Sequence, residues 1–182
     1  DPEFLALDLI SQAEHSGDTF CYLITNSEKT AKLVNQIVSK LLPTIQRKEL
    51  VKSSLSKNGF IAVCKNSSDM VNLANSLAPE HLQIMTKNPK LISSKITTAG
   101  LVLLGDYSPS SASDYILGSN HILPTNGFGK IRGSLSVMDF IKINTEVTAS
   151  RLSLSKISKH LDTLTASEGL PNHYEAVRGR LQ

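Results

Sequence analysis

The chain has 182 residues, of which 40% are hydrophobic and 19% charged, and a formal net charge of +3, a composition typical of a globular protein. Its lysines and arginines form no run longer than Arg47-Lys48, which argues against nucleic-acid binding, and no apolar stretch approaches the roughly 20 residues of a membrane span. Cys21 and Cys64 lie in apolar runs and are not spaced as a zinc pair, so we expect buried thiols in a cytoplasmic protein.

The first expected element is a helix at the amino terminus. Asp1 can cap it, Pro2 fits the first helical position, and Glu3 favours the positive end of the helix dipole. A chain that begins at a helix cap looks like part of a longer one. Further along, the pattern predicts buried strands at residues 19–25, 60–64, 81–85 and 101–104, and amphipathic helices at 27–42, 43–55 and 67–77, the last capped by Ser67. This alternation predicts a parallel α/β sheet covered by helices.

The pattern changes after Gly105, where Pro, Gly, Ser and Asn become frequent and predict long loops around one short helix at residues 111–117. From Thr148 onward the chain is expected to be helical, with one break at residues 169–171. An apolar stripe of Ile157, Leu161 and Leu164 marks the first tail helix. Because this tail follows a completed sheet and contains no strand, we predict an α/β domain over residues 1–147 and a helical tail over 148–182 that packs on a neighbour.

Four of the five histidines lie in short polar segments. Gln12 and His15 are three residues apart near the end of the first helix, which places both side chains on one face, about 5–6 Å apart at Cβ. Zinc accepts imidazole nitrogen readily, and an amide oxygen is a possible if unusual ligand. The alternative is a solvated helix end, with His15 favourable beside the negative end of the dipole.

Glu80 and His81 follow Pro79 at the boundary between a helix and the next strand. Ligands in open α/β sheets bind beyond the carboxyl ends of strands, whereas His81 begins one, so its position argues against catalysis. An adjacent acid and imidazole can nevertheless divide proton transfers between them. A polar strand edge is the alternative interpretation.

The loop-rich stretch and the tail contain the remaining candidates. Asp114 can serve a divalent metal or a cationic ligand, or it is simply acidic surface on a short helix. His121 precedes Ile-Leu-Pro in an ordered-looking loop, and Glu168 and His173 flank the break in the tail, which would hold both at a defined corner. His160 lies mid-helix near lysines and is expected to be a surface residue.

Read in order, these segments resemble histidinol dehydrogenase. The likeness extends almost from end to end of the chain and agrees in order and intervals. The matching stretches are residues 9–15, 77–82, 114–115, 118–125, 135–140 and 168–173.

The resemblance implies a zinc-dependent enzyme of histidine biosynthesis that uses NAD to oxidise L-histidinol to L-histidine in two steps through an aldehyde. It implies that Glu80 and His81 are the acid–base pair and that Gln12, His15, Asp114 and His173 hold one zinc ion per site. These four ligands, together with His81, His121 and Glu168, are the substrate-binding residues that it implies. It also implies a cytoplasmic homodimer in which the tail carries Glu168 and His173 to the partner's site.

One departure from the family limits these expectations. Members of the family are considerably longer, and the part that is missing here carries the NAD contacts and further strands of a Rossmann-like sheet, which is therefore incomplete in this chain. Residues 127–133 miss the dinucleotide fingerprint by one residue, so no cofactor-binding residue is expected here. The chain is a fragment, half of a split enzyme, or a non-catalytic zinc-binding or dimerisation module. Intact Glu80 and His81 favour an enzyme, since a structural zinc site needs neither.

Overall fold

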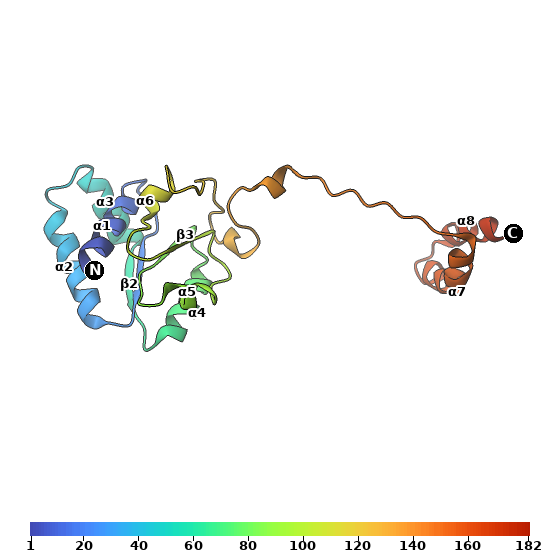
Figure 1. The fold of residues 1–182 in the computed structure, drawn as a ribbon, viewed down its shortest axis with the longest axis horizontal. Helices are drawn as coiled ribbons and strands as arrows, with labels where there is room; N and C mark the ends of the chain where they lie inside the picture. Colours follow the sequence, from blue (N-terminus) through green and yellow to red (C-terminus); the bar gives the residue numbers. More distant parts are fainter. The chain divides into compact units, whose positions relative to one another are not determined.

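The computed structural model describes all residues 1–182, which divide by their contacts into two compact units, residues 1–139 and 140–182 (Figure 1). The first unit contains every strand, and the second contains the last two helices. The expected boundary at residue 147/148 lies further along the chain, within the segment before the first tail helix, and as a domain assignment it stays a prediction. No helix in the structure is both long and apolar enough to span a membrane.

Two pairs of parallel strands form the centre of the first unit. β1 (Tyr22–Thr25) pairs with β2 (Phe60–Val63), and β3 (His81–Ile84) pairs with β4 (Leu101–Leu104). The predicted parallel α/β fold is confirmed, but the strands form two separate two-stranded sheets rather than one sheet. Residues of β1 and β3 both line one cleft, and the two strands are not paired with each other.

The first helix supplies much of the core. α1 (Pro2–Ala13) is capped as expected, with the Asp1 carboxylate accepting from the Glu3 amide at 2.8 Å. Its buried residues Ala6, Ile10 and Ala13 repeat at helical spacing and pack against α2 (Glu28–Leu41), α3 (Lys48–Asn58) and β1. This packing fixes the carboxyl-terminal end of α1, where Gln12 lies.

Several helix boundaries differ from the expectations. α3 begins at Lys48 rather than at Pro43, because residues 42–47 form turns and Arg47 adopts a left-handed φ of 53°. The cap of α4 (Ser67–Leu77) is Asn66 rather than Ser67, since the Asn66 side chain accepts from the Asp69 amide at 2.9 Å. The unpredicted α5 (Pro89–Ser93) is a single short helix that begins with proline.

Two burial predictions were wrong near β2. Phe60, Ile61 and Val63 are 41%, 36% and 48% exposed, because little of the chain packs over the side-chain faces of β2. Cys64, which follows β2, is half-buried for the same reason. Cys21 is buried as expected, and this burial raises the pKa of its thiol to about 11.

The stretch after β4 contains only short elements, as expected. The predicted short helix is α6 (Ser110–Ser113), which ends at Ser113 instead of Leu117 and places Asp114 at its carboxyl-terminal cap. Two 3-10 turns follow, η1 (Phe128–Lys130) and η2 (Val137–Phe140). Gly129 of η1 packs directly on the backbone of residues 98–100, which holds this loop against the entrance of β4.

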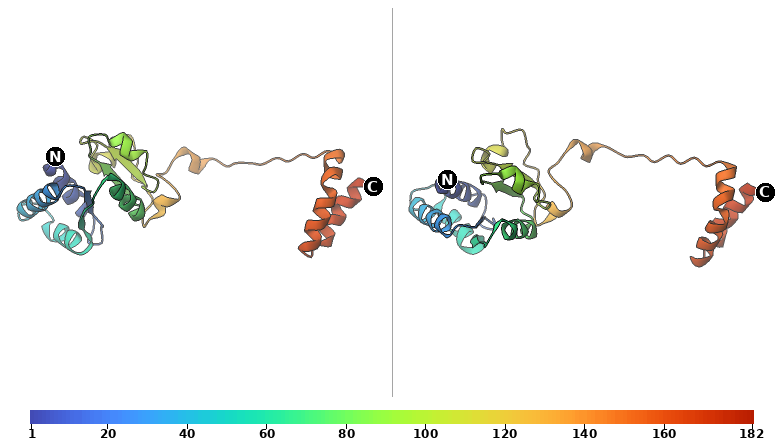
Figure 2. Two further views of the ribbon diagram at one scale, coloured as in Figure 1. Left: turned by 90° about the horizontal axis from the view of Figure 1, so that it is seen from below. Right: turned by 60° about the horizontal axis from the view of Figure 1, so that its bottom comes forward.

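The second unit is a pair of helices that lie side by side, α7 (Arg151–Ser167) and α8 (Pro171–Leu181) (Figure 2). Gly169 ends the first with a left-handed φ of 70°, which confirms the predicted break. The predicted apolar stripe is only partly buried, since Ile157 and Leu164 are 52% and 59% exposed. The face of α7 that includes Ser158 and Thr165 packs on α8 instead, with the Ser158 and Tyr174 hydroxyls 3.4 Å apart.

Candidate active site

A cleft with a volume of about 1250 Å³ opens in the first unit between β1 and β3. Three of the residues expected from the sequence line it: Gln12 from the end of α1, and Glu80 and His81 from the entrance of β3. Ser110 from α6 lies at the same cleft. The structure therefore brings residues from three elements to one concave surface.

The best-defined contact at this site joins His81 to Asp114. Their closest atoms, Nε2 of the imidazole and Oδ1 of the carboxylate, are 3.1 Å apart, and the side chains are 16% and 13% exposed. Because an ionised carboxylate only accepts hydrogen bonds, Nε2 carries the proton and a neutral imidazole has its lone pair on Nδ1. In this tautomer Nδ1 is the ring nitrogen that can accept a proton.

The backbone around Glu80 fixes the positions of Glu80 and His81. Ala78 closes α4 in the left-handed region, at φ 46° and ψ 59°, and turns the chain directly into β3. The Pro79 and Glu80 carbonyls then accept from the Gly100 and Leu101 amides, each at 2.9 Å. Glu80 and His81 are consequently anchored on parallel-strand hydrogen bonds rather than on a free loop.

Gln12 is linked to the same region through α6. Its Nε2 donates to the Ser110 hydroxyl at 2.5 Å, and Ser110 is 4% exposed. The Ser110 carbonyl in turn accepts from the Asp114 amide at 3.1 Å. One short helix therefore connects two predicted metal ligands that are far apart in the sequence.

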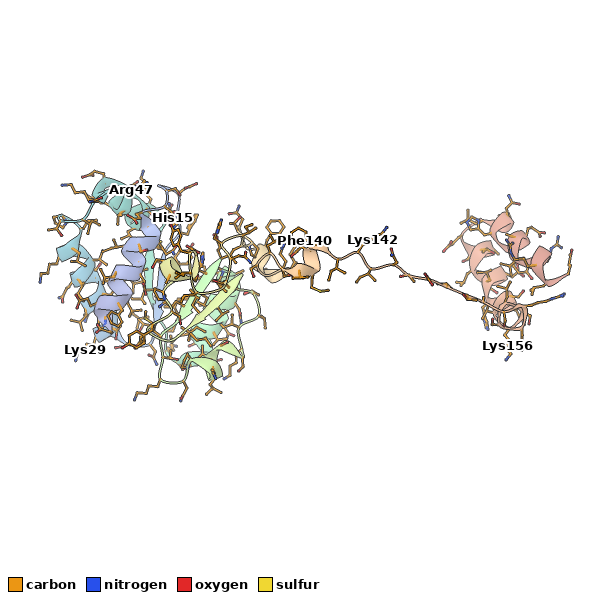
Figure 3. All side chains as sticks on the ribbon, turned by 45° about the horizontal axis from the view of Figure 1, so that its top comes forward. His15, Lys29, Arg47, Phe140, Lys142 and Lys156 are labelled. Atoms are coloured by element: carbon orange, nitrogen blue, oxygen red, sulfur yellow. The ribbon has the colours of Figure 1, made fainter.

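Within the first unit, His15, Asp114 and His121 do not line this cleft. His15 lies exposed just beyond the carboxyl end of α1 (Figure 3), and His121 is exposed in its loop. Glu168 and His173 belong to the second unit, where both are exposed at the turn between α7 and α8. No three His, Cys, Asp or Glu side chains within the chain are close enough together to hold a metal. The predicted ligand set of Gln12, His15, Asp114 and His173 thus stays a prediction.

The donor atoms of this set fit zinc. Two imidazole nitrogens, one carboxylate oxygen and one amide oxygen match the nitrogen and oxygen ligands that zinc binds at about 2.0–2.2 Å. Asp114 Oδ1 contacts His81, which leaves its second oxygen for a cation. The Gln12 amide uses its nitrogen towards Ser110, which leaves the carbonyl oxygen, the end that a metal requires.

Sequence reasoning missed two residues at this site. Ser110 carries no local signal, because its contact with Gln12 depends on tertiary packing between α1 and α6. Asp8 did carry a signal in the sequence. It lies four residues before Gln12, a spacing that places both side chains on one face of a helix. Asp8 lines the cleft with Gln12, and burial raises the pKa of its carboxyl, an effect that its interaction with Gln83 partly opposes.

The raised pKa of Asp8 predicts a pH-dependent stability effect. Because the folded state binds the proton more tightly than the unfolded chain, the stability that this group contributes is present below its unfolded pKa and is lost as the pH rises through the folded pKa. Asp8→Asn should therefore stabilise the chain at pH 7, by less than about 1 kcal/mol since the group is half-buried and screened by solvent. Urea unfolding at several pH values would measure this gain, which should vanish towards about pH 3–4. The exposed Asp106→Asn is the control, and an equal gain there would contradict the burial argument.

Comparison with known proteins agrees with this fold. The family model described as histidinol dehydrogenase matches residues 1–181. Relatives named histidinol dehydrogenase from Oceanobacillus iheyensis and Methanopyrus kandleri are 39% and 40% identical, over 97% and 99% of this chain. A crystal structure of histidinol dehydrogenase from Elizabethkingia anophelis matches all of this chain and 42% of its own, with a TM-score of 0.88 and 34% identity.

The chain spans 42% of the length of these two relatives and corresponds to their carboxyl-terminal portion. The match nevertheless runs from the capped start of α1 to the end of α8, and includes every candidate residue named above. The chain belongs to the histidinol dehydrogenase family.

Proposed function

We propose that this chain supplies the zinc-binding and proton-transfer residues of an NAD-linked oxidation of L-histidinol to L-histidine through L-histidinal. The observation that carries the proposal is His81, which lines the cleft beside Glu80 and contacts the Asp114 carboxylate. An imidazole oriented by a carboxylate is a common arrangement for a general base near neutral pH. The names of the relatives give histidinol as the substrate and its dehydrogenation as the reaction. The use of NAD, the aldehyde intermediate and the place in histidine biosynthesis rest on the family resemblance, and all of these are proposals for this chain.

In the first oxidation, His81 accepts the proton of the substrate hydroxyl as the carbon that bears it is oxidised. The hydrogen bond from Nε2 to Asp114 keeps Nδ1 unprotonated and stabilises the imidazolium that forms. Because His81 is the first residue of β3, its backbone is held by pairing with β4 and its ring needs little reorganisation.

In the second oxidation, Glu80 removes a proton from the water that attacks the aldehyde. The hydrate that results is then oxidised to the carboxylic acid, with the Glu80 carboxyl returning its proton to solvent. Adjacent positions in the chain allow the two groups to act on the same carbon in turn.

Gln12, His15, Asp114 and His173 are the residues that we propose for zinc. When bound, zinc supplies a positive charge that orients the polar groups of the substrate. His121 and Glu168 are proposed to contact the substrate. Since Glu168 and His173 lie in the second unit, the proposal includes a homodimer in which this unit completes the partner's site. The NAD contacts are proposed to lie outside this chain, and a cytoplasmic location stays a prediction.

A second candidate is a non-catalytic zinc-binding or dimerisation module. The exposed apolar residues of the tail favour an interaction role, since Leu152, Ile157 and Leu164 are 66%, 52% and 59% exposed. Such a module needs neither Glu80 nor the His81–Asp114 pair, so the two candidates differ in whether these residues affect turnover.

Joining this chain to the amino-terminal part of the Oceanobacillus iheyensis relative tests the proposed function. With L-histidinol and NAD, the joined protein should form NADH, whereas the 182-residue chain alone should not, because the proposed NAD contacts lie outside it. Measurement of NADH absorbance separates the outcomes, with the unmodified relative as the positive control. A folded but inactive joined protein would favour the non-catalytic module. Steady NADH formation by the chain alone would contradict the location of the cofactor site.

A further inference from the structure

The chain just before Glu80 is tied to the segment that enters β4. Asn75, in the last turn of α4, donates from Nδ2 to the Lys95 carbonyl at 2.9 Å and accepts at Oδ1 from the Thr97 amide at 2.9 Å. The Thr98 hydroxyl donates to the main-chain carbonyl of Asn75 at 2.7 Å. This carbonyl has no partner four positions further along the helix, because the residue there is a proline.

The side-chain amide of Asn75 satisfies its two main-chain partners in one orientation only. A main-chain N–H only donates and a main-chain carbonyl only accepts, so Thr97 requires the amide oxygen and Lys95 requires the amide nitrogen. Alanine at position 75 would lose both contacts, although it is the better helix former. Asn75 therefore stabilises the junction between α4 and residues 95–98 rather than the helix itself.

The same two stretches of chain meet again at Glu80. The Pro79 and Glu80 carbonyls accept from the Gly100 and Leu101 amides, each at 2.9 Å. A Cβ on Gly100 would stand 2.8 Å from the Glu80 carbonyl oxygen, so the two backbones approach too closely for a side chain. Because closely packed backbone transmits displacements, a shift of the segment before Gly100 moves Glu80 and His81.

We propose that Asn75 is a positioning residue for Glu80 and His81, acting through residues 95–98. The proposal rests on the proposed function and goes beyond it, since Asn75 does not line the cleft. Misplacing a reacting group by about 1 Å can cost about 10²-fold in rate, even when the substitution lies far from the chemistry. We therefore expect Asn75→Ala to slow oxidation of the alcohol by about 10–100-fold.

Oxidation of L-histidinol by the joined protein, followed as NADH formation, tests this role. Asn75→Ala should lower kcat by about 10–100-fold. Thr98→Val, which removes the hydroxyl at nearly constant size, should also lower kcat, and Thr98→Ser, which keeps the hydroxyl, should restore most of it. The matched control is Asn72→Ala, an exposed asparagine of the same helix, which should turn over as the parent does. Parental kcat in Asn75→Ala would overturn the proposal.

A second background separates positioning from a general structural effect. In His81→Asn the proposed base of the alcohol step is already absent, so Asn75→Ala should slow that step little further. A merely structural role would give the same loss in both backgrounds and overturn the proposal. The comparison also serves if Asn75→Ala is less stable, because a loss of folded protein lowers both rates equally.

Amide hydrogen exchange in the 182-residue chain tests the same junction without turnover. Asn75→Ala should speed exchange of the Gly100 and Leu101 amides, which pair with the carbonyls of Pro79 and Glu80, and leave the amides of β2 at parental rates. Unchanged exchange at Gly100 and Leu101 would show that Asn75 does not hold this part of the chain and would overturn the proposal. If the joined parent forms no NADH, the proposed function itself fails, and this role with it.

Discussion

Replacing His81 by asparagine in the joined, active protein should slow oxidation of the alcohol by about 10²–10⁴-fold, the usual contribution of a general base. The 3.1 Å contact with Asp114 leaves Nδ1 of His81 as the acceptor for the hydroxyl proton, and an amide cannot take that proton. Turnover should be compared at saturating zinc, since His81 is not a proposed ligand but contacts Asp114, which is one. His160→Asn is the matched control, because His160 is exposed on α7 and has no proposed role.

Replacing Glu80 by glutamine should affect the other half of the reaction. The amide cannot remove a proton from water, so conversion of the aldehyde to the acid should slow by about 10²–10⁴-fold while the alcohol step changes much less. Supplying L-histidinal directly separates the two steps in a stopped assay of product acid. Glu28→Gln, an exposed substitution on α2, is the control. If Glu80→Gln oxidises the aldehyde as fast as the parent, water activation belongs to another group.

Gly129→Ala should be among the most destabilising small substitutions in the chain. A Cβ at this position would stand 2.1 Å from the Thr98 carbonyl oxygen and 3.0 Å from the Gly100 nitrogen, and both atoms belong to backbone that cannot move aside cheaply. Overpacking of this kind costs about 1–3 kcal/mol, and we expect the upper part of that range because the opposing atoms are main chain. The loop around η1 would have to leave the entrance of β4, next to Glu80 and His81.

Urea unfolding of Gly129→Ala beside Gly133→Ala measures this effect. The control glycine lies in the same loop, but its Cβ would meet only the Gly100 carbonyl oxygen at 3.7 Å, an ordinary contact. Gly133→Ala should therefore leave the unfolding free energy nearly unchanged or raise it slightly by restricting the unfolded chain. Similar values for the two variants would show that the loop does not rest on residues 98–100.

The sequence predicted the parts of the fold that depend on local pattern. β3 and β4 are found where short apolar runs predict them, and the break at Gly169 follows from a residue that tolerates a left-handed backbone. The prediction that β2 is buried was wrong, because apolar, β-forming residues specify a strand but not what covers it. α3 starts later than predicted because the preceding turn ends at Arg47, whose backbone is left-handed. Nothing in the sequence indicates that an arginine adopts this conformation.

The candidate site was predicted as a set of residues but not as a set of contacts. Spacing on a helix relates Gln12 to His15, yet the structure links Gln12 to Ser110 and leaves His15 exposed. The His81–Asp114 contact joins residues 33 positions apart, one at the start of β3 and the other at the carboxyl-terminal cap of α6. Periodicity within an element cannot report such pairs, because they depend on how separate elements meet.

The claim that this chain carries a zinc site shared between two subunits is tested most directly by the metal content of mixed variants, which needs no other part of a longer protein. After zinc loading and removal of free metal, His15→Ala and His173→Ala should each bind little zinc as measured by mass spectrometry. When equal amounts of the two variants exchange subunits, about half of the dimers contain one subunit of each variant. Each such mixed dimer has one intact site of two, so about a quarter of the parental zinc content should return. No recovery in a mixture whose subunits demonstrably exchange, or parental zinc content in either single variant, would contradict the shared site.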